Sequence, residues 1–437
     1  MPTTPFRWFN ATAGFRSCFI LGFSISAAIP CQADQPSPPS AAASTPVPSD
    51  AGPRQPVGPQ ASITCSGITL NPGDNIQSTV SANGPNTVFC LNPGTYVQQS
   101  IRPRDGNQFI GRKGAVLDGQ NKVQYFLNTA ANNIVVKNLV ITNYANPLQE
   151  GAINSTGSNW LIQNNEISYN RGAGIKVDNG TRVIANYIHH NHQMGYSAHG
   201  TNVLFDSNEI AFNNYLKEVD VGWEAGGGKA WDTQHLTMQY NYSHDNWGPG
   251  LWSDYNNIWT VYRYNKIENN GRAGIQHEIS YNATIVGNVL QNNGLEGGQY
   301  CNWLWCSEIQ IQNSSGIEGG RYAGSIEITG NTVKTNQHGK GIALIQQNRG
   351  KGDKYGPAPW IVRNVNVHNN IIDLSNGGGT GAVQDVNDNS IFTSRNNRFD
   401  HNTYILGGHS GSFTWNNKWG DVSYWQSFGL DLNGTFK

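Results

Sequence analysis

The stretch Asn165-Glu-Ile-Ser-Tyr-Asn170 decides the fold, because it returns as Asn186-Tyr-Ile-His-His-Asn191 and again as Asn208-Glu-Ile-Ala-Phe-Asn213. Each copy places two asparagines five residues apart around a short apolar centre. Where copies are closest, they begin 21 to 24 residues apart. A period of about 22 residues with short β-branched strands and Asn turns is typical of a solenoid of β-coils. Each coil is then expected about 4.8 Å above the previous one.

The repeat covers most of the chain. The first Asn is expected at Asn138, Asn165, Asn186, Asn208, Asn241, Asn265, Asn288, Asn331 and Asn397. The second is expected at Asn143, Asn170, Asn191, Asn213, Asn246, Asn270, Asn293, Asn336 and Asn402, while Asn370 fits the first position with Ser375 at the second. Asn tolerates the left-handed backbone that a tight bend needs, and stacked amides can hydrogen-bond as ladders. The longer spacings indicate insertions on one side of the coil.

The composition supports this interpretation. The 437 residues include 55 Asn and 51 Gly but only 57 charged residues, and Asn and Gly form helices poorly. This excludes an all-α protein, and 37% hydrophobic residues with 13 Trp exclude simple disorder. A net charge of −1 offers no basic field for nucleic acid.

The ends of the chain predict secretion. Residues 1–33 have the basic start, short apolar run and small residues of a signal peptide, although Cys31 leaves a lipid anchor open. Residues 34–60 are rich in Pro, Ser and Ala and predict a disordered linker. We expect one domain over 61–437, with entry coils at 61–120, repeats at 121–405 and a cap at 406–437. No later apolar run is long enough for a membrane span.

Four cysteines follow the predicted signal peptide. An even number in a secreted chain favours disulfides. Sequence proximity favours the pairs Cys65–Cys90 and Cys301–Cys306, although three pairings of four cysteines exist.

The Asn repeats resemble those of the right-handed parallel β-helix proteins of the pectate-lyase-like superfamily. The resemblance covers roughly residues 100–405 and implies an all-β solenoid of about ten to twelve coils with capped ends. It also implies that the outward strand face cleaves polysaccharides. The motifs of polygalacturonases, mannuronan epimerases and pectate lyases are missing, so the resemblance assigns no catalytic residue.

Counting from the first Asn gives the register of one strand face. Apolar residues at +10, such as Ile175 and Ile275, mark the inside, so +11 and +13 point outward. The coil after Asn208 has an insertion, and either Asp232 or Trp231 joins the +13 row. In the second case Lys229 joins Lys176 at +11. The +13 row then holds Asp178, His199, Asp254 and Glu278.

Acids about 5 Å apart are costly unless a metal, a shared proton or a cation compensates them. One candidate is a calcium site, and its oxygen ligands would be Asp178, Asp254 and Glu278. The candidate catalytic residues are Glu224, Lys229, His244, Asp254 and Glu278. The candidate substrate-binding residues are Lys176, His199, Trp231, Trp252, Arg272, Gln276 and Trp303.

Three functions fit this face. A polysaccharide lyase would neutralise a uronate, with Ca²⁺ for example, and use Lys229 or His244 as base. A glycoside hydrolase would pair Asp254 with Glu278, with Glu224 or Asp232 opposite. A binding or surface solenoid would need none of these acids. We favour the lyase, because Lys and Arg lie near the acids, and we expect a secreted, extracellular or periplasmic monomer acting on a polysaccharide.

Overall fold

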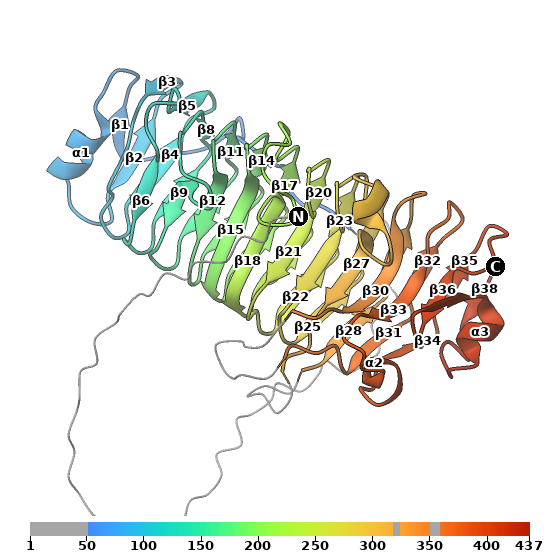
Figure 1. Cartoon of the computed structure of the whole chain (residues 1–437). Helices are drawn as coiled ribbons and strands as arrows, with labels where there is room; N and C mark the ends of the chain where they lie inside the picture. The colour runs from blue at the N-terminus through green and yellow to red at the C-terminus, as the bar shows by residue number, and fades with distance from the viewer. Residues whose placement is uncertain (1–50, 318–323, 350–358) are drawn as a thin grey trace, which may run out of the picture. The chain divides into compact units, whose positions relative to one another are not determined.

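The computed structural model describes residues 51–317, 324–349 and 359–437. The predicted signal peptide and the first part of the predicted linker therefore lie outside the described residues. The described chain is an all-β, right-handed parallel β-helix, as expected (Figure 1). Its sheets A, B and C contain 13, 13 and 12 strands in the described part of the chain, against about ten to twelve coils expected.

Sheet A is formed, in spatial order, by β1 (Ile68–Leu70), β2 (Val88–Leu91), β4 (Gln108–Gly111), β7 (Val135–Lys137), β10 (Leu161–Gln163), β13 (Arg182–Ile184), β16 (Leu204–Asp206), β19 (Thr237–Gln239), β22 (Thr260–Arg263), β25 (Ala283–Val286), β28 (Ile326–Thr329), β31 (Val365–His368) and β34 (Arg398–Asp400). Sheet B is formed by β3 (Gly94–Val97), β5 (Ala115–Asp118), β8 (Val140–Thr142), β11 (Glu166–Ser168), β14 (Tyr187–His189), β17 (Glu209–Ala211), β20 (Tyr242–His244), β23 (Lys266–Glu268), β26 (Val289–Gln291), β29 (Thr332–Lys334), β32 (Ile371–Asp373), β35 (Thr403–Ile405) and β38 (Thr435–Phe436).

Sheet C, which carries the predicted site, is formed by β6 (Leu127–Thr129), β9 (Gly151–Ser155), β12 (Ala173–Val177), β15 (Met194–Thr201), β18 (Gly226–Gln234), β21 (Leu251–Asp254), β24 (Ile275–Glu278), β27 (Ser307–Gln312), β30 (Lys340–Gln346), β33 (Thr380–Gln384), β36 (Phe413–Trp415) and β37 (Lys418–Gly420). The helices are α1 (Ile76–Ala82), α2 (Ser390–Thr393), α3 (Val422–Gln426) and the 3₁₀ turn η2 (Gly298–Cys301).

The interior of the coils is a continuous apolar column. Alternate residues of each strand point inward, and Ile175, Tyr196, Leu251 and Ile275 of sheet C are all buried. The pairing Leu251↔Ile275 places like positions of neighbouring coils above one another. Alternation then leaves the intervening side chains of each strand on the outer face.

Two buried asparagine ladders hold the bends in register. At each step the backbone N–H and the side-chain Nδ2 of one Asn both donate to Oδ1 of the Asn in the next coil, as from Asn165 to Asn186 at 2.9 Å for both bonds. The first ladder is Asn165, Asn186, Asn208, Asn241, Asn265, Asn288, Asn331, Asn370 and Asn402. The second ladder is Asn170, Asn191, Asn213, Asn246, Asn270 and Asn293.

The ladders differ from the expected set at both ends. Asn138 lies one residue before the ladder position, because it is the N–H of the following residue, Leu139, that donates to Asn165. Asn143 is displaced in the same way, since Tyr144 donates to Asn170. Near the other end, three expected members make other contacts than predicted, although Asn336 keeps its expected register opposite Asn293. Asn402 continues the first ladder, Asn397 instead receives the N–H of Val365, and Asn336 donates to the backbone of Asn293.

An acid ends each ladder. Glu308 accepts both donors of Asn293, and Asp431 accepts both donors of Asn402. Burial raises the pKa of Glu308 to about 8, against the lowering effect of its bonds from Asn293. Burial likewise raises the pKa of Asp431. Both carboxyl groups therefore favour the protonated form more than an ordinary acid does.

The ends of the repeat region and the cysteines behave as their sequences indicate. Helix α1 lies at the N-terminal end beside β1 (Figure 1). At the other end Phe413, Trp415 and Trp425 are buried, and β36 and β37 form an antiparallel pair. Both expected disulfides, Cys65–Cys90 and Cys301–Cys306, are present.

Residues 51–60 differ from the expected disordered linker. They lie against the outside of several coils in an extended path. Gly52 donates to the carbonyl of Tyr264, and Gly58 donates to the carbonyl of Ala185. Between them, the Arg54 guanidinium lies 3.8 Å from the centroid of the Tyr240 ring. Proline-rich sequence lacks turn and strand signals, but an extended segment needs neither when the coils supply its hydrogen-bond partners.

Candidate active site

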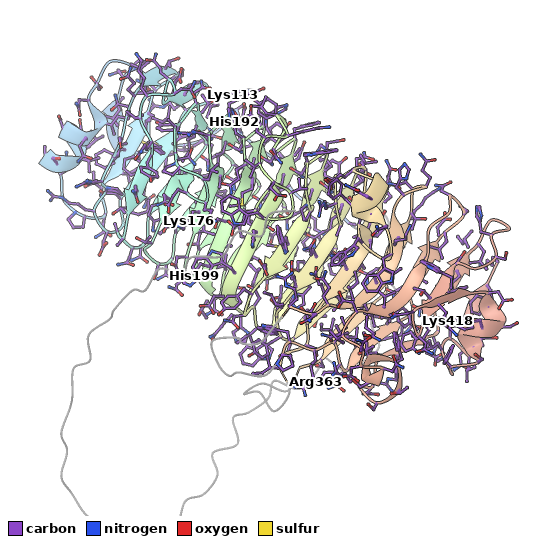
Figure 2. The ribbon with its side chains drawn as sticks, viewed as in Figure 1. Lys113, Lys176, His192, His199, Arg363 and Lys418 are labelled. Atoms are coloured by element: carbon purple, nitrogen blue, oxygen red, sulfur yellow. A yellow bond between two sulfur atoms is a disulfide. The ribbon has the colours of Figure 1, made fainter. Side chains whose placement is uncertain are left out.

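The outward row lies on sheet C in the register expected from the sequence. Asp254 pairs with Glu278, and Trp252 pairs with Gln276. Lys229 lies between Ser197 and Trp252, which confirms the alternative that places Lys229 in the row of Lys176. A register shift between Ala198 and Gly200 lets His199 face both Trp231 and Asp232. Figure 2 shows Lys176 and His199 on this face.

The N-terminal part of the row is an ion-paired group that we term the open triad, Asp178, His199 and Asp232. His199 Nδ1 lies 3.2 Å from Asp178, and Nε2 lies 3.9 Å from Asp232. Hydrogen bonds to Asp178 and Asp232 raise the pKa of His199 to about 9. The same histidine holds the pKa of Asp178 below its usual value, against the effect of burial. The imidazolium compensates these two acids as a cation.

The C-terminal part is more deeply buried, and we term it the covered cluster, Glu224, Lys229, Asp254 and Glu278. Lys229 Nζ lies 2.6 Å from Asp254 and 3.3 Å from Glu224. Burial disfavours the ammonium, but the two carboxylates outweigh it and raise the pKa of Lys229. Lys229 is therefore a charged partner of the acids rather than the free base expected for a lyase.

Glu278 is the perturbed acid of the covered cluster. Burial and the charge of Asp254 raise its pKa, although Arg349 acts in the opposite direction. Gln276 donates to one of its carboxyl oxygens at 2.7 Å, and Arg349 contacts the other. A buried carboxyl group beside a second carboxylate retains its proton to higher pH, which is the property required of a general acid.

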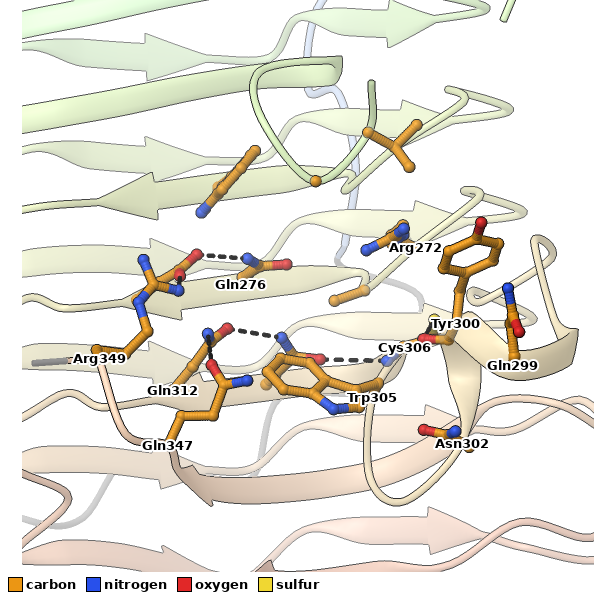
Figure 3. A pocket seen from close by; sticks show the side chains of 16 residues that line it. Arg272, Gln276, Gln299, Tyr300, Asn302, Trp305, Cys306, Gln312, Gln347 and Arg349 are labelled. Atoms are coloured by element: carbon orange, nitrogen blue, oxygen red, sulfur yellow. Dashed lines mark hydrogen bonds and ion pairs between the residues drawn. The ribbon is translucent and has the colours of Figure 1, made fainter. Parts of the chain in front are cut away.

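Glu278 lines a cleft of about 340 Å³ on the outer face of sheet C (Figure 3). Val221 and Gly222 of the insertion after Asn213 lie on one side of it. Trp305, inside the loop closed by the second disulfide, and Tyr300, just before that loop in η2, form another wall. The insertions that interrupt the repeat are therefore the elements that turn a flat strand face into a cleft.

The predicted tryptophans have different positions. Trp252 faces outward but is only 2% exposed, because Lys229 lies over its ring at 4.4 Å. The expected open stacking surface at Trp252 is therefore wrong, although Trp252 is among the residues that line the cleft. Trp231 is 38% exposed and lies against the His199 ring. Trp303 packs on the apolar cluster of Leu304, and its neighbour Trp305 lines the cleft instead.

The remaining predicted residues fall into two groups. Arg272 and Gln276 line the cleft, and Arg272 forms an ion pair with Glu296. His244 lies on sheet B, where Asp245 and Glu209 bind its ring nitrogens at 2.7 and 3.3 Å. Those two acids outweigh burial and raise the pKa of His244. His244 therefore lies on a different sheet from the covered cluster.

The predicted calcium ligands do not converge. Asp178 follows β12 and Asp254 ends β21, with β15 and β18 between them. Three strand spacings amount to about 14 Å, whereas calcium lies about 2.3–2.6 Å from each oxygen ligand. One ion therefore cannot contact both side chains. Within the described residues, no group of three His, Cys, Asp or Glu is arranged to hold a metal.

Several cleft residues were missed by sequence reasoning. Gln310 and Gln312 lie on β27, the strand next to β24, where they pair with Gln276 and Glu278. Gln347 and Arg349 come from the segment after β30. Counting from Asn288 does not reach the β27 pair, because the insertion that contains Cys301 and Cys306 lies between them. Arg349 carries no repeat signal.

Comparison with known proteins supports the fold. Residues 151–316 match the family model described as the right handed beta helix region. No curated protein sequence matches the chain. Among solved structures, the catalytic unit of a GH87 alpha-1,3-glucanase from Streptomyces thermodiastaticus strain HF3-3 is similar, with 11% identity, a TM-score of 0.52, and coverage of 87% of this chain and 70% of that one.

Two further structures have lower scores. The A-module of mannuronan C-5 epimerase AlgE4 from Azotobacter vinelandii is 12% identical, with a TM-score of 0.41 and coverage of 71% and 94%. The PL6 lyase Pedsa3628 from Pseudopedobacter saltans is 13% identical, with a TM-score of 0.38 and coverage of 85% and 91%. At such identities the likeness concerns the fold. No helix in the described residues has the length and apolarity to cross a membrane.

Proposed function

We propose that the protein is a secreted glycoside hydrolase that cleaves a polysaccharide in the cleft at Glu278. One observation carries this proposal: Asp254 and Glu278 are directly paired on neighbouring strands, yet their surroundings differ. Asp254 is bound by the Lys229 ammonium, whereas burial and Asp254 itself raise the pKa of Glu278. Two carboxyl groups with separated protonation states are what glycoside hydrolysis requires.

The proposed reaction gives the two carboxyl groups different roles. Directly paired side chains on neighbouring strands are about 5 Å apart, which suits a double displacement. Glu278 donates its proton to the leaving glycosidic oxygen as the bond to the anomeric carbon breaks and Asp254 forms a bond to that carbon. Water then displaces Asp254 from the carbon and gives its proton to Glu278, which restores both groups. Lys229 and Gln276 hold the two carboxyl groups in place.

The lyase that the sequence favoured now has weaker support. Its two candidate bases are Lys229, which is ion-paired and has a raised pKa, and His244, which lies on sheet B. Neither is a neutral base beside a substrate in the cleft. The hydrolase therefore takes the place of the lyase in our proposal. The two disulfides suit an oxidising compartment, which agrees with the proposed secretion.

The proposal is tested by product analysis with a panel of neutral and acidic polysaccharides. We expect new reducing ends without an absorbance increase near about 235 nm, because hydrolysis forms no unsaturated sugar. Rising absorbance would instead establish β-elimination. Binding of a polysaccharide without any cleavage would contradict the proposed enzymatic activity and favour a binding solenoid.

A further inference from the structure

We infer that the cleft recognises an uncharged, hydroxyl-rich polysaccharide and excludes polyuronates. The inference rests on the proposed site at Glu278 and adds its substrate class. It comes from two features of the described residues: the way in which every nearby cation is already neutralised, and a chain of amide side chains across the cleft floor.

Among the described residues, each cation at the site lies beside an acid of this chain. Arg272 pairs with Glu296, and Arg349 contacts Glu278. When Glu278 holds its proton, Lys229 and Arg349 still balance the two carboxylates of Glu224 and Asp254. Lys229 faces two carboxylates, those of Glu224 and Asp254. Farther along the row, Lys176 Nζ lies 2.9 Å from Glu150, and His199 lies between the acids of the open triad.

A polyuronate carries a carboxylate on each sugar and needs cations to receive it. At this site it would meet cations that are already balanced, together with the carboxylates of Glu224 and Asp254. Like charges in a partly buried cleft repel one another strongly, because the local dielectric is low. An uncharged chain avoids this cost.

The floor of the cleft offers amides instead. Gln310 Nε2 donates to Gln312 Oε1 at 3.3 Å, and Gln312 Nε2 donates to Gln347 Oε1 at 2.9 Å (Figure 3). On the neighbouring strand Gln276 donates to Glu278. Each amide has two donor hydrogens and an oxygen that accepts two bonds. Gln310 and Gln312 each use one donor and one acceptor position on neighbours, which leaves capacity for other bonds.

Hydroxyl groups are the natural partners of such amides, because a hydroxyl also donates and accepts. The rings of Tyr300 and Trp305 at the wall add apolar surface for the C–H faces of a sugar. Neutral amides, neutral rings and compensated charges together define a site for a neutral glycan. The same site gives a uronate carboxylate no unpaired cation among the described lining residues.

Binding is measured separately from catalysis with the mature protein carrying Glu278→Gln, which mimics the protonated acid. The probes for affinity electrophoresis are neutral glucans and galactans, each paired with its carboxymethylated derivative, together with polygalacturonate and alginate. At low salt we expect at least one neutral glycan to bind, and its carboxylated derivative to bind at least about tenfold more weakly. Raising the salt concentration narrows the difference, because salt screens the repulsion.

Two variants test the features individually. Gln312→Leu should weaken binding of the neutral glycan about tenfold, whereas Gln163→Leu on sheet A should leave it unchanged. Gln347→Lys adds a cation and should strengthen binding of the carboxylated derivative about fivefold.

Equal or tighter binding of the carboxylated polymers, or no binding of any glycan, would overturn the inference. Binding of a neutral glycan by a wild-type protein that releases no product would contradict the proposed hydrolase only.

Discussion

The open triad and the covered cluster occupy the same face of sheet C, yet they differ in burial and in charge. In the open triad His199 provides a cation to two acids and remains about one-third exposed. In the covered cluster the insertions bring loops over the strands, and Glu278 is almost completely buried. The repeat therefore places acids at regular intervals, and the loops bury one of them, Glu278, so that its pKa is raised, whereas the pKa of Asp178 is lowered.

The largest effect is expected for Glu278→Gln. Loss of a general acid reduces kcat by about 10²- to 10⁴-fold. The polysaccharide identified in the product assay serves as substrate. Wild-type activity should also fall as pH rises through the raised pKa of Glu278, because the proton is then lost. Glu166→Gln on sheet B is the matched control and should retain full activity. An unchanged kcat in Glu278→Gln would show that the covered cluster has no catalytic role that distinguishes it from the open triad.

Two lysines in one outward row give the next comparison. Lys229→Met leaves two poorly exposed carboxylates without their cation, and breaking a buried pair costs about 3–5 kcal/mol. Lys176→Met breaks a more exposed, partly buried pair with Glu150, and a pair near the surface is worth about 0–1 kcal/mol. Urea unfolding of both variants measures the difference in the free energy of unfolding. Similar losses in the two variants would show that the loops do not isolate the covered cluster from water.

Glu308 is buried in the coil interior and not under a loop. It therefore tests whether burial alone raises the pKa of a carboxyl group. Its pKa of about 8 lies above the usual value of about 4.5. The folded state therefore binds the proton more tightly than the unfolded state. This stabilisation is complete below pH 4.5 and is lost as pH rises through about 8.

Glu308→Gln should remove that pH dependence, since one amide oxygen can accept both donors of Asn293, as in the rest of the ladder. We expect the Tm of the wild type to fall by several degrees between pH 5 and 8.5 relative to this variant. Glu166→Gln should follow the wild type. Parallel curves for Glu308→Gln and the wild type would mean that interior burial alone does not raise a carboxyl pKa here.

The sequence predicted the solenoid and the strand register well, for a physical reason. Each coil needs Asn at its bends, so the repeat in residues such as Asn165 and Asn186 is a direct record of the ladder. The same counting located Asp254 beside Glu278. Asn336 has the expected register, but its side chain donates to the Asn293 carbonyl, while Glu308 accepts the donors of Asn293 from sheet C.

What the sequence did not predict depends on insertions. Trp252 has an outward position, but the contact with Lys229 that buries it requires the folded coils. Arg349 contacts Glu278 from 71 residues away and belongs to no repeat. The protonation state of Lys229 also depends on the folded structure. The sequence allows it to be a base or an ion-pair partner, and its distances from two acids decide for the ion pair.

The smallest effect is expected in the open triad. The pKa of His199, about 9, exceeds its usual value of about 6.5, so its stabilisation is present below pH 6.5 and is lost as pH rises through about 9. Because the group is partly exposed, we expect His199→Gln to lower the Tm by only about 1–2 °C at pH 6 and not at pH 10. Activity should stay within about threefold of the wild type, and the exposed His409→Gln should show neither change. A loss of activity as large as that of Glu278→Gln would instead extend the active site along the whole row, since the open triad would then act on the substrate.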